Sequence, residues 1–243
     1  MITINQLRKP IWKTVYTEST PNSLCNLSCL NSTAGELTVK NTRQRGYNKF
    51  LAELKNNDGE KLGSDLFGIY PEDKKIFDFN MEIKPQYRQK NLFFGELLKI
   101  KGIIEMLENK FKTIELTSKE TAVYFHSKFL FEPNIKSFTQ RDYALKTIAN
   151  NRQSGFEEFS NRAELIQESI RNREDNETKR NLCKITTNLV QEYINKVLSS
   201  GKDNYKNHLF EFPIDMVLTK EKVEQNSTFF NNLFKKHGID YNI

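Results

Sequence analysis

The sequence predicts an α/β protein in which a mixed central sheet is flanked by helices and a helical insertion precedes the last strand. Three consecutive segments predict this class: an apolar, β-rich run at 76–83, an amphipathic helix at 93–111 and a short strand at 113–117. Pro85 closes the first run, because proline cannot donate a hydrogen bond to a strand ladder. A helical crossover of this length most often joins parallel strands.

The long helix is predicted from apolar residues that recur at alternating steps of four and three, which places them on one stripe. They are Phe93, Leu97, Ile100, Ile104, Leu107 and Phe111. Lys99, Lys101, Glu105 and Glu108 lie off this stripe. A short helix is expected to follow the strand at 113–117. Ser118 can cap this helix, which is expected to extend to Lys128. Its expected buried face is Ala122, Phe125 and Phe129.

A hairpin is expected before this unit. Residues 47–55 and 61–70 are predicted strands, and Asn57-Asp58-Gly59 between them supplies the positive φ angles that a tight turn requires. With the run at 76–83 they form a meander of three antiparallel strands. The first 46 residues carry less pattern. A strand is expected at 2–4 or at 11–16, and residues 17–42, rich in Ser, Thr and Asn, are expected to form loops or a short helix.

The chain after Phe131 is predicted to be mainly helical. Apolar residues share helical faces through 141–198, with a polar break at 171–177 and a stop at 199–204. A last strand is expected within 209–220, and a short terminal helix at 223–237.

Composition narrows the class of protein. The chain has no run of eighteen apolar residues, so we expect no membrane span. Its first residues hold no apolar signal core, which favours a cytoplasmic location. Cys25, Cys29 and Cys183 suit a reducing compartment. No second ligand pair accompanies Cys25 and Cys29, so we expect no metal site.

Positive charge is concentrated in the first part of the chain. Residues 1–150 hold 23 basic and 17 acidic residues, a difference of +6, whereas residues 151–243 hold 14 of each. The basic residues around the predicted crossover are Lys84, Arg88, Lys90, Lys99 and Lys101. A polyphosphate ligand would be drawn to such a cluster, and a solvated basic face is the alternative.

The order of strand, Pro-x-Tyr-Arg, helix, strand and Ser-x-x-x-Ala-x-x-Phe resembles the GNAT superfamily of acetyl-CoA-dependent N-acetyltransferases. Ile83–Arg88 is similar to the loop that leads into that family's cofactor site, and Lys119–His126 resembles its second motif. Asp215–Lys220 looks like its final strand, and the likeness is concentrated at 47–135. The resemblance implies an acyltransferase core at 1–138, a helical insertion at 139–206 that covers the acceptor side, and a last strand and C-terminal helix at 207–243.

Several positions depart from the family pattern. Asn91 and Phe93 stand where the family's loop carries glycines, and Lys119 replaces the usual asparagine. His126 stands in the place of a tyrosine, and Leu130 in the place of a glycine.

The resemblance implies acetyl-CoA as co-substrate, bound where the loop enters the helix. A helix N-terminus favours anions, so the loop backbone could hold the pyrophosphate. Asn91 tolerates a left-handed conformation, and Phe93 is compatible if its side chain turns inward. The expected cofactor-binding residues are Ile83, Arg88, Gln89, Lys90, Asn91, Leu92 and Phe93.

Three further groups are candidates for the chemistry that the resemblance implies. The N–H near Ile83 can stabilise an oxyanion. His126 can donate a proton near neutral pH, with a surface helix residue as the alternative interpretation. Glu82 and Glu115 can accept the proton of an amine, the alternative being charges at an exposed strand end.

The expected function is transfer of an acetyl or other acyl group from coenzyme A to an amine on a small molecule or a protein. Two alternatives remain open: a catalytically silent protein of the same fold that acts as an interaction module, and an acyltransferase for aminoacyl-tRNA, ranked last. Apolar helix faces at 139–206 leave a homodimer open, and we expect no membrane partner.

Overall fold

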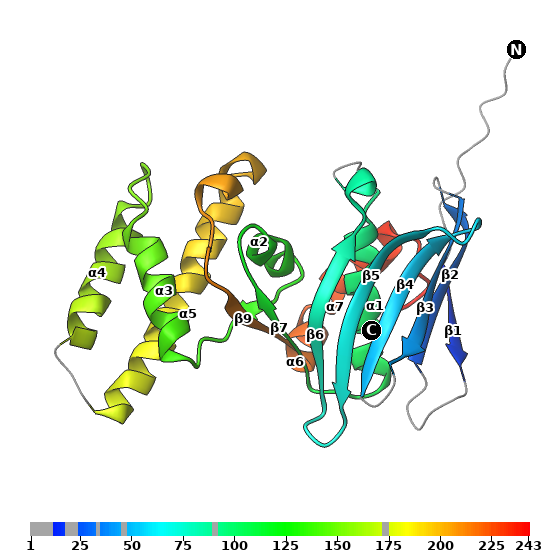
Figure 1. Cartoon of the computed structure of the whole chain (residues 1–243), viewed down its shortest axis with the longest axis horizontal. Helices are drawn as coiled ribbons and strands as arrows, with labels where there is room; N and C mark the ends of the chain where they lie inside the picture. Colours follow the sequence, from blue (N-terminus) through cyan, green and yellow to red (C-terminus); the bar gives the residue numbers. More distant parts are fainter. Residues whose placement is uncertain (1–11, 18–23, 33–34, 45–47, 89–91, 172–174) are drawn as a thin grey trace, which may run out of the picture. The chain divides into compact units, whose positions relative to one another are not determined.

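The computed structural model describes residues 12–17, 24–32, 35–44, 48–88, 92–171 and 175–243. The chain forms two compact units, the first comprising Met1–Ile114 with Thr219–Ile243 and the second comprising Glu115–Leu218 (Figure 1). The chain leaves the first unit after Ile114 and returns to it at Thr219. Strands and helices occur in both units, so the predicted α/β class is confirmed. The three-part division expected from the sequence stays a prediction.

Six described strands of the first unit pair antiparallel in chain order. They are β1 (Trp12–Thr17), β2 (Leu24–Ser32), β3 (Gly35–Arg43), β4 (Lys49–Asn56), β5 (Lys61–Tyr70) and β6 (Lys75–Ile83). The strand expected at 11–16 is β1, and the alternative at 2–4 lies outside the described residues. The expectation of loops or a short helix at 17–42 is wrong, because β2 and β3 extend the expected three-stranded meander. Threonine and valine suit a pleated strand, and Val39 of β3 is fully buried.

The hairpin between β4 and β5 has the turn that the sequence predicts. Gly59 has a φ of +76°, and its N–H donates to the carbonyl of Asn56 at 3.0 Å. A glycine adopts this left-handed conformation without the steric cost that a side chain would add. Within β5, a side chain at Gly63 would not fit, since a Cβ there would lie 2.6 Å from Cδ1 of Ile83 and 2.8 Å from the carbonyl oxygen of Glu82.

A β-bulge interrupts β6. Two of its residues, Phe79 and Asn80, stand opposite Leu66 of β5. An extra residue reverses the alternation of faces along a strand. Asp78 is therefore buried before the bulge, while Ile83 is half-buried after it and the residues between them are mostly exposed.

The helix α1 (Phe94–Glu108) packs on one face of this sheet, against β4, β5 and β6 (Figure 1). The predicted apolar stripe is confirmed at Leu97, Ile100 and Ile104 in the helix and at Phe111 just beyond it, all of which are buried. Three of the four charged residues off the stripe are buried too, and Glu108 is exposed. Lys99, Lys101 and Glu105 expose 2%, 1% and 0% of their surface, so charged groups lie inside the layer between helix and sheet.

These buried charges pair with one another and with carboxylates of the sheet. Nζ of Lys99 donates to Oδ2 of Asp78 on β6, and Nζ of Lys101 lies 3.2 Å from Oε2 of Glu105. Burial, and then the charge of Asp78, raise the pKa of Asp65 on β5 well above its ordinary value. Burial lowers the pKa of Lys99, but Asp78 and Asp65 outweigh it, so the net shift is upward. This buried cluster therefore favours a neutral Asp65 beside an ionised Lys99–Asp78 pair.

Two helices complete the first unit. They are α6 (Lys220–Gln225) and α7 (Ser227–Lys236). The single helix expected at 223–237 is thus divided at Asn226, whose side-chain amide donates to the carbonyl of Lys222 at 2.8 Å. Phe230 and Phe234 of α7 are fully buried.

The second unit contains a small sheet in which β9 (Ile214–Thr219) lies between β7 (Thr113–Ser118) and β8 (Glu132–Pro133). The strand expected at 113–117 is confirmed, and so is a last strand within 209–220, which begins after Pro213 and lies one residue earlier than Asp215–Lys220. The short helix α2 (Ala122–Ser127) has Thr121 as its N-cap.

The expected cap and buried face of α2 are partly wrong. Ser118 does not cap the helix, since it ends β7 and is buried there. Ala122 is exposed, Phe125 is half-buried and Phe129 is buried. The buried residues of α2 are Val123, Tyr124, His126 and Ser127.

Three helices form most of the second unit, as the helical pattern predicts. They are α3 (Phe138–Ala149), α4 (Glu157–Arg171) and α5 (Asn176–Ser199), followed by the 3₁₀ segment η2 (Lys202–Asn207). Asp175 caps α5 by accepting the N–H of Thr178 at 2.7 Å, which explains the polar break before it. None of the helices in the described ranges is long and apolar enough to cross a membrane.

Candidate active site

The candidate site in the first unit starts where β6 ends. The N–H of Lys84 donates to the carbonyl of Leu62 at 3.0 Å, and the next pair along the ladder is Gly63 with Ile83. Hydrogen-bonded and non-hydrogen-bonded pairs alternate between antiparallel strands. The N–H and carbonyl of Ile83 therefore point away from β5, and Nε of Arg88 donates to that carbonyl at 2.7 Å. The oxyanion role expected for the Ile83 N–H stays a prediction.

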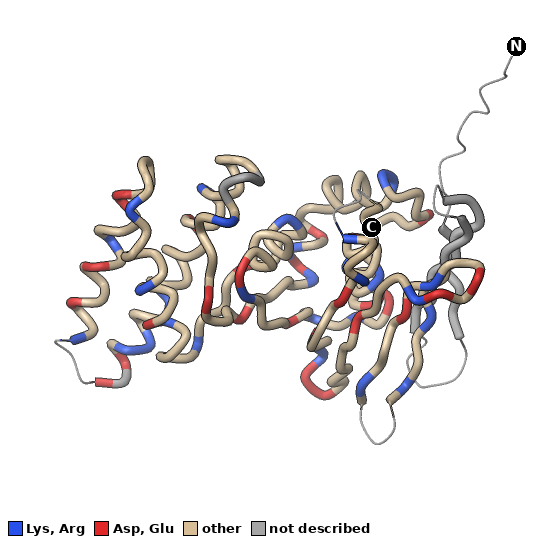
Figure 2. The backbone as a smooth tube through the Cα atoms, turned by 45° about the horizontal axis from the view of Figure 1, so that its top comes forward, with Lys and Arg blue, Asp and Glu red and all other residues tan. Residues whose placement is uncertain are grey.

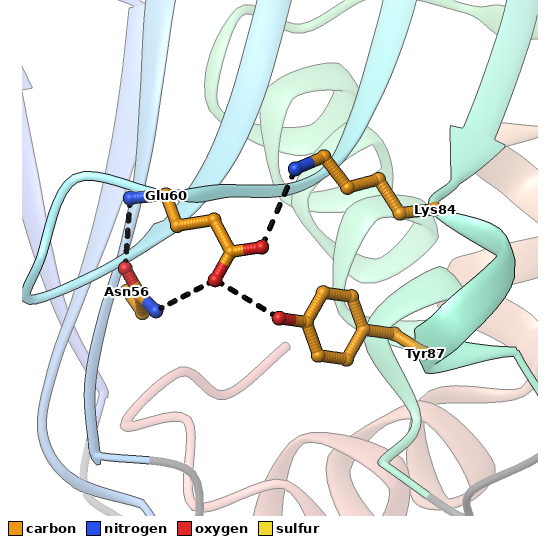
Figure 3. Close-up of polar contacts among 4 residues, drawn as sticks. All are labelled: Asn56, Glu60, Lys84 and Tyr87. Atoms are coloured by element: carbon orange, nitrogen blue, oxygen red, sulfur yellow. Dashed lines mark hydrogen bonds and ion pairs between the residues drawn. The ribbon is translucent and has the colours of Figure 1, made fainter.

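The loop after β6 is held by Glu60, which follows the β4–β5 turn (Figure 3). The hydroxyl of Tyr87 donates to Oε2 of Glu60 at 3.0 Å, and Nζ of Lys84 donates to Oε1 at 3.4 Å. Oδ1 of Asn56 accepts the N–H of Glu60 at 2.8 Å. The hydrogen bond from Tyr87 is the largest effect that lowers the pKa of Glu60, and the same bond raises the pKa of Tyr87. This Glu60 clasp (Asn56, Glu60, Lys84 and Tyr87) fixes the first half of the loop to the hairpin.

Sequence reasoning missed Glu60. Its role depends on the register that brings the start of β5 beside the end of β6, and the residue types alone do not fix that register.

The N-terminus of α1 follows this loop, and its N-cap residue provides no side-chain cap. Phe93, its N-cap residue, has φ 56° and ψ 22°, and its carbonyl accepts the N–H of Leu97 at 3.0 Å. The first N–H groups of a helix lack partners within the helix, and the helix dipole favours a negative charge there. Phe93 thus adopts the left-handed conformation in which a glycine is least strained, and it opens an anion-binding geometry.

The side chain of Phe93 does not turn inward as expected. It is 45% exposed, because the left-handed N-cap directs it away from the buried stripe of α1. Its ring lies 4.5 Å from Nζ of Lys236 and 5.8 Å from the ring of His237, at the end of α7. Both residues also contact Glu96 in the first turn of α1, at 3.0 Å and 2.7 Å. Burial raises the pKa of Glu96, but His237 and then Lys236 outweigh it, and the net shift is downward.

The predicted basic cluster is smaller than the sequence suggests. Lys84 and Arg88 lie in the loop, whereas Lys99 and Lys101 are buried between α1 and the sheet and are unavailable to a ligand. Lys236 adds a cation beside Phe93 that the spacing of basic residues in the sequence does not predict. Basic and acidic residues are interspersed along the described backbone rather than gathered on separate segments (Figure 2).

Four more residues, between Arg88 and Phe93 in the sequence, are expected to bind the cofactor. Gln89, Lys90 and Asn91 lie outside the described residues, and Leu92 is half-buried. The uncapped helix start and the cations of Arg88 and Lys236 fit a phosphorylated ligand.

The three candidate catalytic side chains are distributed over both units. Glu82 is exposed on β6 of the first unit, and Glu115 is half-buried on β7 in the second. His126 exposes 8% of its surface and packs against Phe125 and Phe131, with ring centroids 5.2 Å and 5.8 Å away. The alternative of a surface residue is therefore wrong for His126, because α2 buries that side. The catalytic roles of these residues stay predictions.

No protein-family model matches this chain, and no curated protein matches it. Solved structures do. GCN5 of Tetrahymena is 13% identical with a TM-score of 0.34, over 39% of this chain and 56% of that one. A nourseothricin acetyltransferase is 13% identical with a TM-score of 0.32, over 51% and 70%. A GNAT acetyltransferase of Staphylococcus aureus Mu50 is 22% identical with a TM-score of 0.33, over 36% and 55%.

Several of the similar structures are described as acetyltransferases of the GNAT family. One was solved with coenzyme A and another with acetyl-CoA bound. The match with GCN5 spans little more than half of that protein, and at these identities the likeness assigns no role to any residue.

Proposed function

We propose that this chain transfers an acyl group, acetyl in the simplest case, from coenzyme A to an amine. The observation that carries the proposal is the start of α1, where Phe93 is left-handed and no side chain of the described residues caps the first N–H groups. A pyrophosphate placed there would accept hydrogen bonds from the helix main chain and face the positive end of its dipole.

Charged side chains near this point support the same ligand. Arg88 is exposed and anchored to the carbonyl of Ile83, so its remaining N–H groups are free to contact a phosphate. Lys236 lies beside Phe93 and would strengthen the contact when it turns from Glu96. The segment from Gln89 to Leu92 would complete the binding loop.

The proposed reaction needs three groups. The amine nitrogen attacks the thioester carbonyl, so a C–N bond forms and the C–S bond breaks. The N–H of Ile83 would stabilise the carbonyl oxygen as negative charge develops. Glu82, on the same strand, would take the proton of the amine, directly or through water, and a proton from solvent would go to the departing sulfur. Glu115 and His126 belong to the second unit, and their roles in these two proton transfers stay predictions.

Release of free thiol from acetyl-CoA tests the proposal, with a polyamine, an amino sugar and a peptide as acceptors. Arg88→Ala should raise the KM for acetyl-CoA at least about tenfold, since a charge-assisted contact is worth about 1.5–3 kcal/mol and about 1.4 kcal/mol corresponds to a factor of ten. Lys110→Ala, which removes an exposed lysine just beyond the other end of α1, is the matched control and should change nothing. Absence of acetyl-CoA binding at about 1 mM together with absence of thiol release would overturn the proposal.

A second candidate, a catalytically silent interaction module, is favoured by the exposed ring of Phe93 at the mouth of the loop. Binding of acetyl-CoA without thiol release from any amine would support it.

The acceptor, whether a small molecule or a protein, stays open, as does a homodimer. Retardation of tRNA on a gel that salt abolishes would raise the aminoacyl-tRNA alternative above its present last place.

A further inference from the structure

The second unit contains a cavity of its own, formed by α3, α5, the 3₁₀ segment η2 and the residues that lead into β9. Its volume is about 360 Å³, within the range that holds small molecules in proteins. All its lining residues belong to the part of the chain predicted from the sequence to be a helical insertion and to the segment after it. The acyl-transfer proposal uses none of them.

One wall of the cavity is a flat aromatic surface. The rings of Tyr143 on α3 and Phe212 before β9 are nearly parallel, with planes 6° apart and centroids 4.1 Å apart. Tyr143 remains 46% exposed, so Phe212 holds the ring in place while much of its surface is open. Such a ring offers a stacking platform to any flat heteroaromatic group.

His208 is a buried polar group in the same lining, with 2% of its surface exposed. The hydroxyl of Tyr193 lies 2.7 Å from its Nδ1, and the side-chain amide of Asn151 donates to that hydroxyl. The side-chain amide of Asn151 also contacts Nδ1 at 2.5 Å. Because an amide N–H can only donate, Nδ1 accepts, and a neutral ring then carries its proton on Nε2. Burial lowers the pKa of His208, which keeps the ring neutral. Among the described residues no side chain or carbonyl accepts from Nε2, which is itself buried behind the cavity surface.

The other lining residues favour an anion with hydrogen-bonding edges. Lys146 and Arg152 are basic and Glu211 is the acid among the lining residues, which leaves a net charge of +1. Arg152 is already paired with Glu164 at 2.6 Å, so Lys146 is the more available cation. Asn150 and Asn207 both lie in the lining, and each side-chain amide supplies a donor and an acceptor, the groups that read the edge of a nucleobase.

We propose that this cavity binds a mononucleotide-like ligand, a flat heteroaromatic ring that carries a phosphate. The ring stacks on Tyr143, its edge meets the amides of Asn150 and Asn207, and the phosphate is held by Lys146. The proposal does not depend on acyl transfer, because it rests on residues of the second unit alone.

Titration of the full chain with AMP, GMP, CMP and UMP tests this proposal by calorimetry. At least one mononucleotide should bind with a Kd below about 1 mM, and both adenosine and ribose 5-phosphate should bind at least tenfold more weakly, because each lacks one recognised part. Tyr143→Ala should weaken binding about tenfold, the size expected for loss of base stacking. Lys146→Ala should weaken it similarly, whereas Lys184→Ala, an exposed lysine of α5 outside the cavity, should leave it unchanged.

Three results would overturn the proposal. They are no saturation by about 10 mM of any mononucleotide, equal binding of ribose 5-phosphate and AMP, and unchanged binding by both cavity variants. Because coenzyme A itself contains a nucleotide, Arg88→Ala separates the two sites. Loss of nucleotide binding in Arg88→Ala with retention in Tyr143→Ala places the nucleotide at α1, and the cavity proposal fails while the acyl-transfer proposal stands. Both cavity residues are exposed, and far-UV circular dichroism confirms that the variants fold.

Discussion

Removing Lys99 from the buried cluster should strongly destabilise the first unit. Lys99→Met keeps nearly the same side-chain volume but leaves the carboxylate of Asp78, which is 7% exposed, without the ammonium group that now donates to it. Breaking a buried ion pair by deleting one partner costs about 3–5 kcal/mol of the free energy of unfolding. At this chain length the midpoint of thermal unfolding should fall by roughly 10 °C.

The neighbouring carboxylate makes the prediction more specific. Asp65 is favoured in its neutral form, so Asp65→Asn replaces a group that already carries a proton. The raised pKa of Asp65 means that the folded state binds a proton more tightly than the unfolded state. The loss of unfolding free energy that Asp65 causes is therefore absent below its ordinary pKa of 3.8. This loss grows as the pH rises toward the pKa of Asp65 in the folded state. Asp65→Asn should change little at low pH and should become stabilising relative to the parent as the pH increases.

Urea unfolding followed by circular dichroism, at several pH values, measures both effects. The control is Asp73→Asn, because Asp73 is 63% exposed and lies 3.8 Å from Lys75, and exposed pairs contribute at most about 1 kcal/mol. A loss below about 1 kcal/mol for Lys99→Met would refute the reasoning. So would a stability difference between Asp65→Asn and the parent that does not change with pH.

Further predictions concern the loop and the packing under it. Glu60→Gln should lower the pKa of Tyr87, because the carboxylate that now accepts its hydroxyl proton raises it; ultraviolet titration of the phenol measures the change, and an unchanged titration would show that the Glu60 clasp does not form in solution. Gly63→Ala should cost about 1–3 kcal/mol of unfolding free energy, since the added Cβ meets backbone that cannot move aside. Gly102→Ala, in the middle of α1 with nothing within 4 Å of the new Cβ, should instead stabilise by up to about 1 kcal/mol, and urea midpoints with the opposite order would contradict both statements.

The hairpin, α1 and β7 could be predicted from the sequence because their signals are local. Gly59 sits where a tight turn needs a positive φ, and the apolar stripe through Leu97 and Ile104 has the period of a helix. Strands β2 and β3 were missed, because their Ser, Thr and Asn residues also occur in loops. Only the pairing of this segment with β4 distinguishes a strand from a loop here.

The parts of the site that depend on tertiary contacts were beyond sequence reasoning. Lys99 was expected off the buried stripe, and only the position of Asp78 after folding explains why a lysine is stable inside the unit. Phe93 fits the apolar period of α1, yet the left-handed N-cap turns it outward toward Lys236, which lies far along the chain. Glu60 acts on Tyr87 and Lys84 through strand register alone.

The measurement that tests the account most directly is a titration of the ¹⁵N-labelled chain with acetyl-CoA, followed through individual main-chain amides. The account predicts saturable shifts for the N–H groups of Phe94, Gly95 and Glu96, where α1 begins without a side-chain cap, and little change at Lys110 beyond its other end. Amides at the start of α1 that stay unmoved up to about 1 mM acetyl-CoA would contradict it.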